Sequence, residues 1–220
     1  MTSAKKYVTA DIFSEDKVVF KDIVKRSAPV PFQRIPIQYI YDDGEEGPLV
    51  IKTHKMFSFG VLENKDVKTG KIQGYSFPFV TGEEDDKFIN MLEKITSMCR
   101  KCVQQKMENG RKTIDVDSLV ILKTKEEYTP AMFVKIRTKY DHKPLTIETP
   151  FKKLAGKKMV DINPLSMVRK KCEAIGAVQI DNIFIGCSIM SIQIKLNELL
   201  VVKEIERESV FEDIDIEDDL

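Results

Sequence analysis

The 220-residue chain contains no tryptophan, two histidines and only four cysteines. No segment approaches the about 18 consecutive apolar residues of a membrane-spanning helix, so we do not expect an integral membrane protein. The first 17 residues lack the apolar stretch of a secretory signal. Four cysteines in a chain without such a leader are expected to be reduced thiols of an intracellular protein.

The formal net charge is zero, but the two signs are unevenly distributed. Residues 204–220 hold nine acids and one arginine, which gives this tail a charge of −8. The other 34 bases and 26 acids leave +8 on residues 1–203. A basic body predicts a polyanionic partner, and an acidic tail either competes with that partner or is a solubility appendage. The tail residues expected to regulate binding or recruit partners are Phe211, Glu212, Asp213, Asp215, Glu217, Asp218, Asp219 and Leu220.

The length and a hydrophobic content of 42% predict a single domain over residues 1–203. Apolar residues alternate at 35–41, and the turn signal Asp42-Asp43-Gly44 joins this segment to a return strand at 48–53. A second predicted hairpin joins 56–62 to 72–80. The remaining predicted strands are 18–24, 113–124, 131–140, 145–149, 174–186 and 188–204. Asn163-Pro164 is expected to open a short helix.

Residues 83–109 change to a helical period, with apolar residues recurring every three or four positions. Thr81 and Glu84 predict a capping box at the start of this helix, and Gly110 predicts its C-terminal end. A mostly β (α+β) chain with one long inserted amphipathic helix is typical of an OB-type β-barrel. A β-sandwich is the alternative, because periodicity does not separate the two architectures.

Residue patterns that would support catalysis are scarce. His54 and His142 stand alone, and Cys99 and Cys102 fall within the apolar stripe of the predicted helix, so core thiols are expected. Asp115 and Asp117 would share one face of a predicted strand and could hold a metal, but no third acid supports them. We therefore expect no enzyme, no metal and no cofactor.

The segment 131–140 combines a core-facing pattern with a basic and aromatic one. Its apolar face holds Met132, Val134 and Ile136. The opposite face holds Phe133, Lys135, Arg137 and Lys139. Side chains on one face of a strand are about 6.6–6.8 Å apart, which suits alternating contacts with the phosphates and bases of a single strand. A solvated, charged strand face is the alternative interpretation.

Further basic residues accompany this segment. Lys65, Lys68 and Lys71 lie in the polar tip of the second hairpin, beside Tyr75, which we expect to be an exposed stacking residue. Phe77 and Phe79 are expected in the core instead. A second cluster around Gly156 consists of Lys152, Lys153, Lys157 and Lys158. These residues complete the predicted interface with single-stranded nucleic acid.

Four segments resemble a known family: IPIQYIYDDGEEGPLVI (35–51), FSFGVLENKDVKTGKIQGYSFPF (57–79), AVQIDNIFIG (177–186) and SIMSIQIKLNELLVV (188–202). They are similar to the single-stranded DNA-binding proteins of nucleo-cytoplasmic large DNA viruses, most specifically at 63–75. This resemblance implies an OB barrel with an inserted helix and an acidic tail, as in the podophage replication type. In that type the tail ends in an aromatic residue, whereas this one ends in Leu220 and has Phe211 as its sole aromatic.

The resemblance implies a viral protein that coats single-stranded DNA without catalysis during replication or recombination. It would act in the nucleus or cytoplasmic virus factory of an infected cell. The acidic tail would compete for the DNA groove and recruit a polymerase or helicase. Two alternatives stay open: a β-rich adaptor that binds no nucleic acid, and a nuclease using Asp115 and Asp117. A homodimer with exchanged tails is also compatible with the sequence.

Overall fold

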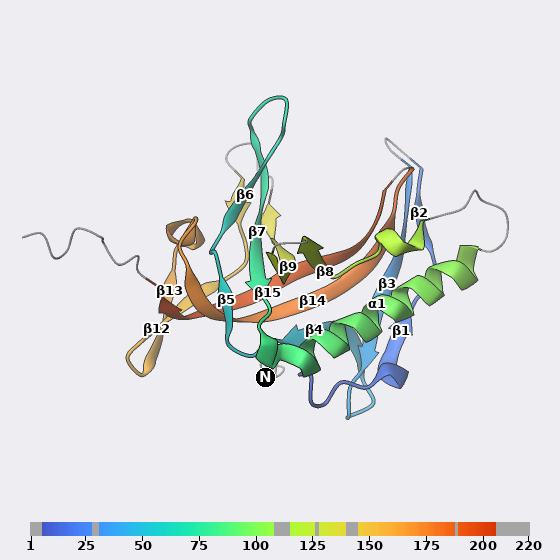
Figure 1. The fold of residues 1–220 in the computed structure, drawn as a ribbon. Helices are drawn as coiled ribbons and strands as arrows, with labels where there is room; N and C mark the ends of the chain where they lie inside the picture. The colour runs from blue at the N-terminus through green and yellow to red at the C-terminus, as the bar shows by residue number, and fades with distance from the viewer. Residues whose placement is uncertain are drawn as a thin grey trace, which may run out of the picture.

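The computed structural model describes residues 6–27, 31–107, 115–125, 128–139, 145–187 and 189–205. Its strands are β1 (Val18–Phe20), β2 (Val24–Arg26), β3 (Phe32–Ile40), β4 (Glu46–Lys52), β5 (Met56–Ser58), β6 (Leu62–Lys65), β7 (Ile72–Val80), β8 (Leu122–Lys125), β9 (Tyr128–Ile136), β10 (Thr138–Lys139), β11 (Thr146–Ile147), β12 (Phe151–Ala155), β13 (Lys158–Ile162), β14 (Cys172–Ile185) and β15 (Met190–Glu204). Its helices are α1 (Asp86–Met107) and the 3₁₀ turns η1 (Glu15–Lys17), η2 (Glu83–Asp85), η3 (Val116–Ser118) and η4 (Pro164–Met167). The predicted mostly β fold with one long helix is confirmed (Figure 1).

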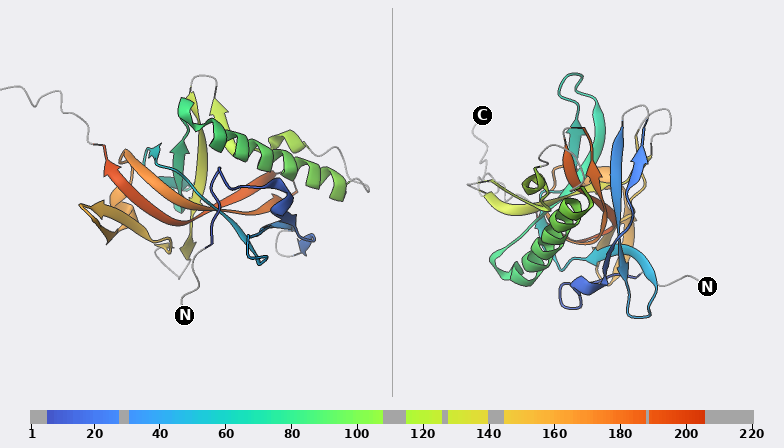
Figure 2. Two further views of the ribbon diagram at one scale, coloured as in Figure 1. Left: turned by 90° about the horizontal axis from the view of Figure 1, so that it is seen from below. Right: turned by 90° about the vertical axis from the view of Figure 1, so that its right-hand side faces the viewer.

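The two longest strands, β14 and β15, pair antiparallel and curve through the whole molecule (Figures 1 and 2). Register shifts interrupt their ladder in three places, and such bulges bend and twist a strand pair. Along its other edge, β14 pairs in turn with β5, β4 and β3. The edge of β15 receives β9 and β12, both in parallel. The closing strand pair predicted from the sequence therefore holds most of the sheet together.

Strand pairing runs from β14 through β5, β7, β9 and β15 and back to β14. Two of the strand pairings in this ring are short, because β5 and β7 share one registered residue pair, and β9 and β15 share two. The ends of β14 and β15 also run past the ring, to β3 and β4 on one side and to β12 on the other. The described strands therefore form a partly open ring, so the OB-type barrel that the sequence predicts is not closed among them.

Helix α1 buries one apolar stripe, as predicted. The buried residues are Phe88, Met91, Leu92, Ile95, Cys99, Cys102 and Val103. The predicted capping box is wrong, because the Thr81 hydroxyl donates to the Pro130 carbonyl oxygen (2.8 Å). The Asp85 carboxylate instead accepts from the backbone N–H of Gly82 (2.6 Å). Gly110 lies outside the described residues. No helix in the described ranges is long and apolar enough to cross a membrane.

Both predicted hairpins are confirmed. Strands β3 and β4 pair antiparallel across a turn in which Gly44 has a φ of 79°, and the odd-numbered residues Ile35, Ile37 and Tyr39 are buried. Strands β5 and β6 together form the first arm of the second hairpin, and β7 forms the other.

The segment 18–24 contributes β1 and part of β2, and each pairs with β3. Asn163 accepts from the Leu165 N–H (3.0 Å) and caps the single turn η4.

The prediction for residues 113–124 is partly wrong, because a strand begins only at Leu122. The Asp115 carboxylate accepts from the Asp117 backbone N–H (3.1 Å) and caps η3. Aspartate side chains favour such local bonds over an extended strand. The two carboxylates therefore do not share a strand face, and the geometry proposed for a nuclease site is lost. No group of three His, Cys, Asp or Glu residues suited to a metal occurs among the described residues.

Gly60 joins β5 to β6 with a φ of 79°, where a Cβ atom would lie 2.3 Å from the Met167 carbonyl oxygen. We expect Gly60→Ala to lower the free energy of unfolding by about 3 kcal/mol or more, because the backbone around Met167 would have to shift to make room for the new methyl group. Gly70 is the matched control, since it has a φ of 66° and no atom within 4 Å of its Cβ position. Gly70→Ala should cost about 1 kcal/mol. Equal losses in urea unfolding would contradict the steric explanation.

Candidate nucleic-acid interface

Strand β9 presents the alternation that the sequence predicts. Its inward side chains are buried: Met132, Val134 and Ile136. Phe133, Lys135 and Arg137 are exposed on the opposite side. The neighbours of β9 in the sheet are β7, β8 and β15, so its outward row is continuous with those of the flanking strands.

Side-chain amides hold two outward cations, Lys135 on β9 and Arg137 directly after its end. The Lys135 ammonium donates to Gln193 Oε1 (2.6 Å). The Arg137 guanidinium donates to Gln179 Oε1 (3.2 Å) and to Asn197 Oδ1. Among the described residues, neither cation forms an ion pair with a carboxylate. The amides fix the position of both charges without neutralising them.

Three further cations surround Lys135. Although Lys135 is exposed as a whole residue, partial desolvation of its ammonium group lowers its pKa, and the positive charges of Lys195, Lys123 and Arg34 lower it further. They come from β15, β8 and β3, so the fold brings together residues that are distant in the sequence. Lys195 alone among them has a carboxylate partner in the described chain, Asp181 at 2.6 Å. We call these residues, with Arg137 and Phe133, the cationic face: Arg34, Lys123, Phe133, Lys135, Arg137 and Lys195.

Aromatic rings lie at two places along the cationic face. The Lys123 ammonium is 5.6 Å from the centre of the Phe133 ring, which is 40% exposed. On the β3 side, the Arg34 guanidinium is 4.8 Å from the centre of the Phe32 ring. Phe32 in turn packs against Phe184, with ring centres 5.4 Å apart. Exposed rings beside cations are the usual elements of a surface that stacks bases and contacts phosphates.

The predicted lysine-bearing loop is a hydrogen-bonded hairpin tip between β6 and β7 that projects from the molecule (Figure 1). Asp66 Oδ1 accepts from the backbone N–H groups of Thr69 (2.7 Å) and Lys68 (3.0 Å). These bonds, led by that of Thr69, hold the pKa of Asp66 below its ordinary value. Lys65 pairs with Glu63 (3.0 Å), while Lys68 and Lys71 are exposed. Because β7 pairs with β9, the hairpin extends from the edge of the cationic face.

The expectation that Tyr75 is an exposed stacking residue is wrong, since its side chain is only 7% exposed. Along β7, Tyr75 alternates onto the inner face with Phe77 and Phe79, which are fully buried as predicted. Gly74 lies on the outer side, and no atom lies within 4 Å of its Cβ position. At Gly74 the outer side of β7 therefore offers open space instead of a ring, whereas Ser76 and Pro78 farther along the strand are buried.

The second predicted lysine cluster is partly neutralised. Lys152 pairs with Glu198 (2.8 Å), and Lys153 pairs with Glu204 (2.6 Å). Lys157 and Lys158 are exposed at the turn between β12 and β13. Lys139 lies on the short strand β10, also exposed and outside the main sheet. The ion pairs of Lys152 and Lys153 direct both ammonium groups to carboxylates of β15.

The predicted acidic tail begins at the end of β15. The hydrogen bond from Lys153 holds the pKa of Glu204 below its ordinary value, and the backbone N–H of Ile205 donates to the Lys171 carbonyl oxygen (2.9 Å). The other tail residues that we singled out lie outside the described residues: Phe211, Glu212, Asp213, Asp215, Glu217, Asp218, Asp219 and Leu220.

Sequence reasoning missed the cations and rings that β3, β8 and β15 contribute to the cationic face. A signal for part of them was present in residues 192–197, where Ile192, Ile194 and Leu196 are inward. Gln193, Lys195 and Asn197 alternate with them and are half-buried on the outer side. This is the same period of two that identified the outward row of β9.

Three of the four cysteines and the described histidine pack within the fold, whereas Cys187 is exposed. Cys99, Cys102 and Cys172 are buried, and burial raises the pKa of each thiol. The interpretation of Cys99 and Cys102 as core thiols is confirmed. His54 lies 2.5 Å from the Asp85 carboxylate and packs edge-on against Phe88. His142 lies outside the described residues.

Residues 13–212 match the family described as "Protein of unknown function (DUF2738)". The chain belongs to this family. The match includes every strand of the DUF2738 cationic face. None of the curated proteins matches the chain.

Repulsion within the cationic face is expected to lower the stability of this DUF2738 protein. We expect Lys135→Met to raise the free energy of unfolding at pH 7 by about 0.5 kcal/mol, and less at high salt. The pKa of Lys135 is lowered in the folded state, so the unfolded state binds more protons between that pKa and 10.5. The stability of the natural protein should therefore rise with pH in that window, and the advantage of the variant should shrink. Lys152→Met, which loses an ion pair with Glu198, is the control and should not stabilise the protein.

Proposed function

We propose that this DUF2738 protein binds single-stranded DNA on the cationic face and coats it without catalysis. The observation that carries the proposal is the amide coordination of Lys135 and Arg137. Cations that are positioned but not neutralised keep their charge for a polyanionic ligand. Phosphate contacts supply most of the affinity of a sequence-independent complex, and release counterions as they form.

A single strand suits the cationic face better than a duplex does. Phe133 lies between Lys123 and the outward cations of β9, so bases can stack where phosphates are also contacted. In a duplex the bases already stack on one another, and their faces are not accessible. In the ring, β5, β7 and β9 follow one another as the first, second and third strands. OB folds bind oligonucleotides on the face of their second and third strands, which correspond here to β7 and β9. The hairpin tip with Lys65, Lys68 and Lys71 occupies the loop that precedes the second strand, β7.

The biological setting of the proposal comes from the resemblance to the single-stranded DNA-binding proteins of large DNA viruses. We propose a role in viral DNA replication or recombination, in the nucleus or cytoplasm of the infected cell. A β-rich adaptor without nucleic-acid binding is the competing function, and the binding experiment below separates the two.

The acidic tail is proposed to compete with DNA for the cationic face. The fifteen residues after Ile205 can extend about 50 Å. Lys195 lies nine residues back along β15 from Glu204, which is about 30 Å. The tail is therefore long enough to reach the cationic face of its own chain. When DNA displaces it, the tail becomes available to a polymerase or helicase.

The first experiment compares a labelled oligo-dT of about thirty nucleotides with the matching duplex, by fluorescence anisotropy. We expect the single strand to bind more tightly, with an affinity that falls between about 50 and about 200 mM salt. Lys135→Ala with Arg137→Ala should weaken binding and reduce the slope of log affinity against log salt by about 1.4, because two phosphate contacts are lost.

The matched control removes two cations of equal charge elsewhere. Lys55 and Lys94 pair with Glu173 and Glu15 (3.0 Å each) and lie off the cationic face. Lys55→Ala with Lys94→Ala should leave the slope unchanged. Equal slopes for both double variants would remove the binding site from the cationic face, and negligible binding by the natural protein would favour the adaptor.

Removal of residues 206–220 tests the tail. We expect the truncated protein to bind oligo-dT about tenfold more tightly at about 50 mM salt, since an internal competitor is lost. The difference should disappear near 200 mM salt because screening weakens the contact between tail and face. A truncation that leaves the affinity unchanged at low salt would contradict tail competition.

A further inference from the structure

A hollow of about 740 Å³ opens beside Arg137, at the end of the cationic face. Its floor is apolar and comes from the outer faces of β4, β14 and β15. The floor residues are Pro48, Val50, Ile175, Ala177 and Leu200. The volume falls in the range of pockets that enclose a small ligand. We call this space the Tyr7 hollow, after the ring in its wall.

The Tyr7 hollow and the cationic face are parts of one surface. Arg137 and Asn197 line the hollow, and the same Arg137 contacts Gln179 on β14. Ala177 and Ile175 follow Gln179 at steps of two along β14 and therefore share its outer face. From Gln179 to Ile175 the strand covers about 13 Å. A DNA strand that follows the cationic face past Arg137 enters the hollow directly.

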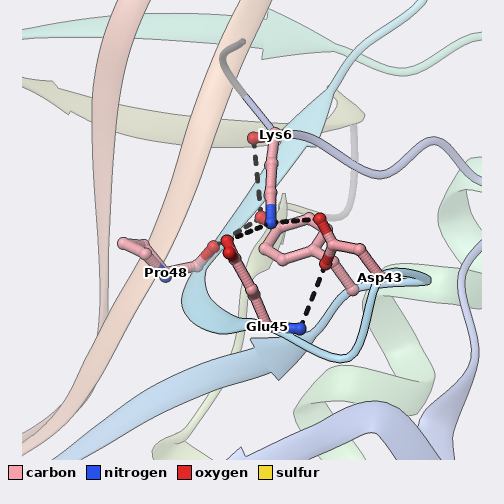
Figure 3. Close-up of polar contacts among 5 residues, drawn as sticks. Lys6, Asp43, Glu45 and Pro48 are labelled. Carbon is pink, nitrogen blue, oxygen red and sulfur yellow. Dashed lines mark hydrogen bonds and ion pairs between the residues drawn. The ribbon is translucent and has the colours of Figure 1, made fainter. Parts of the chain in front are cut away.

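The wall of the hollow is fixed by contacts of the N-terminal segment. The Val8 N–H donates to the Val50 carbonyl oxygen, and the Lys52 N–H donates to the Val8 carbonyl oxygen (2.8 Å each). Lys6 forms ion pairs with Asp43 and Glu45 in the turn between β3 and β4 (Figure 3). These bonds on both sides of Tyr7 hold its backbone in place, while its side chain remains 45% exposed.

The charges around the hollow are also arranged for an anion. Its carboxylates are paired: Glu45 with Lys6, Glu46 with Lys21, and Glu198 with Lys152. Arg137 has amide partners, and the Lys52 ammonium lies 5.1 Å from the centre of the Tyr7 ring. Neither of these two cations has a carboxylate partner among the described residues. The rim therefore keeps positive charge above an apolar floor.

We propose that the Tyr7 hollow receives a nucleobase of the bound strand. The base would stack on the Tyr7 ring above the apolar floor, and its phosphate would lie at Arg137 and Lys52. An apolar cavity with an aromatic wall and cations at its rim matches a base and its phosphate. This inference rests on the proposed function and adds a defined subsite to it.

A single-tryptophan reporter tests the proposal, because the natural chain has no tryptophan. We expect the emission of Tyr7→Trp to be quenched as oligo-dT saturates the protein, since a stacked base quenches the indole. Gln104→Trp is the control, at an exposed position of α1 next to the buried Val103. It should bind DNA equally well without quenching. Equal emission changes for both reporters would overturn the proposal.

Affinity gives a second, independent measurement. Tyr7→Ala should weaken oligo-dT binding about tenfold with the same salt slope, because a stacking contact is lost and no phosphate contact is. Tyr7→Phe should bind like the natural protein, and urea unfolding confirms that each variant is folded. Natural affinity in folded Tyr7→Ala would overturn the base subsite and leave the proposed function intact. Failure of the natural protein to bind oligo-dT would instead overturn the proposed function.

Discussion

The antiparallel ladder of β14 and β15 is the constraint on which the other features depend. Its registers with β3, β4, β5, β9 and β12 decide which side chains become neighbours. Lys195 stands next to Lys135 because β9 joins β15 in parallel at that residue. The Tyr7 hollow forms farther along the same ladder, where β4 borders β14. A one-residue slip of either long strand would turn the outward row into the core.

The partners of Lys135 and Arg137 differ from those of many other cations in the described chain. Several lysines elsewhere pair with carboxylates, as Lys152 does with Glu198. On the cationic face, Gln193, Gln179 and Asn197 take that place for Lys135 and Arg137. Like charges with few counter-charges reduce stability, and proteins commonly retain such costs where a ligand binds. This arrangement supports the proposal that the cationic face binds a polyanion.

The sequence predicted what depends on local periodicity. Steps of two placed Phe133, Lys135 and Arg137 on one side of β9, and steps of three and four placed Cys99 and Cys102 in the core. It could not predict pairing between distant segments, so Lys123, Lys195 and Arg34 were missed. Tyr75 was misplaced because the neighbouring lysine loop was given more weight than the period of two, which puts Tyr75 on the same strand face as Phe77 and Phe79. The Tyr7 hollow depends on long-range register, which one sequence does not reveal.

The two slight links in the ring of strands have a mechanical consequence. Strands β7 and β9 share six registered pairs with each other, but β9 shares two with β15 and β7 shares one with β5. The β7–β9 ribbon, with its projecting hairpin, is thus joined more firmly within itself than to its neighbours. Distances along each row of side chains are fixed by the strand, whereas two registered pairs set the width between the rows of β9 and β15. For the proposed single strand of DNA, we therefore expect contacts at constant spacing along each row, with the width between the rows as the dimension that adapts to the ligand.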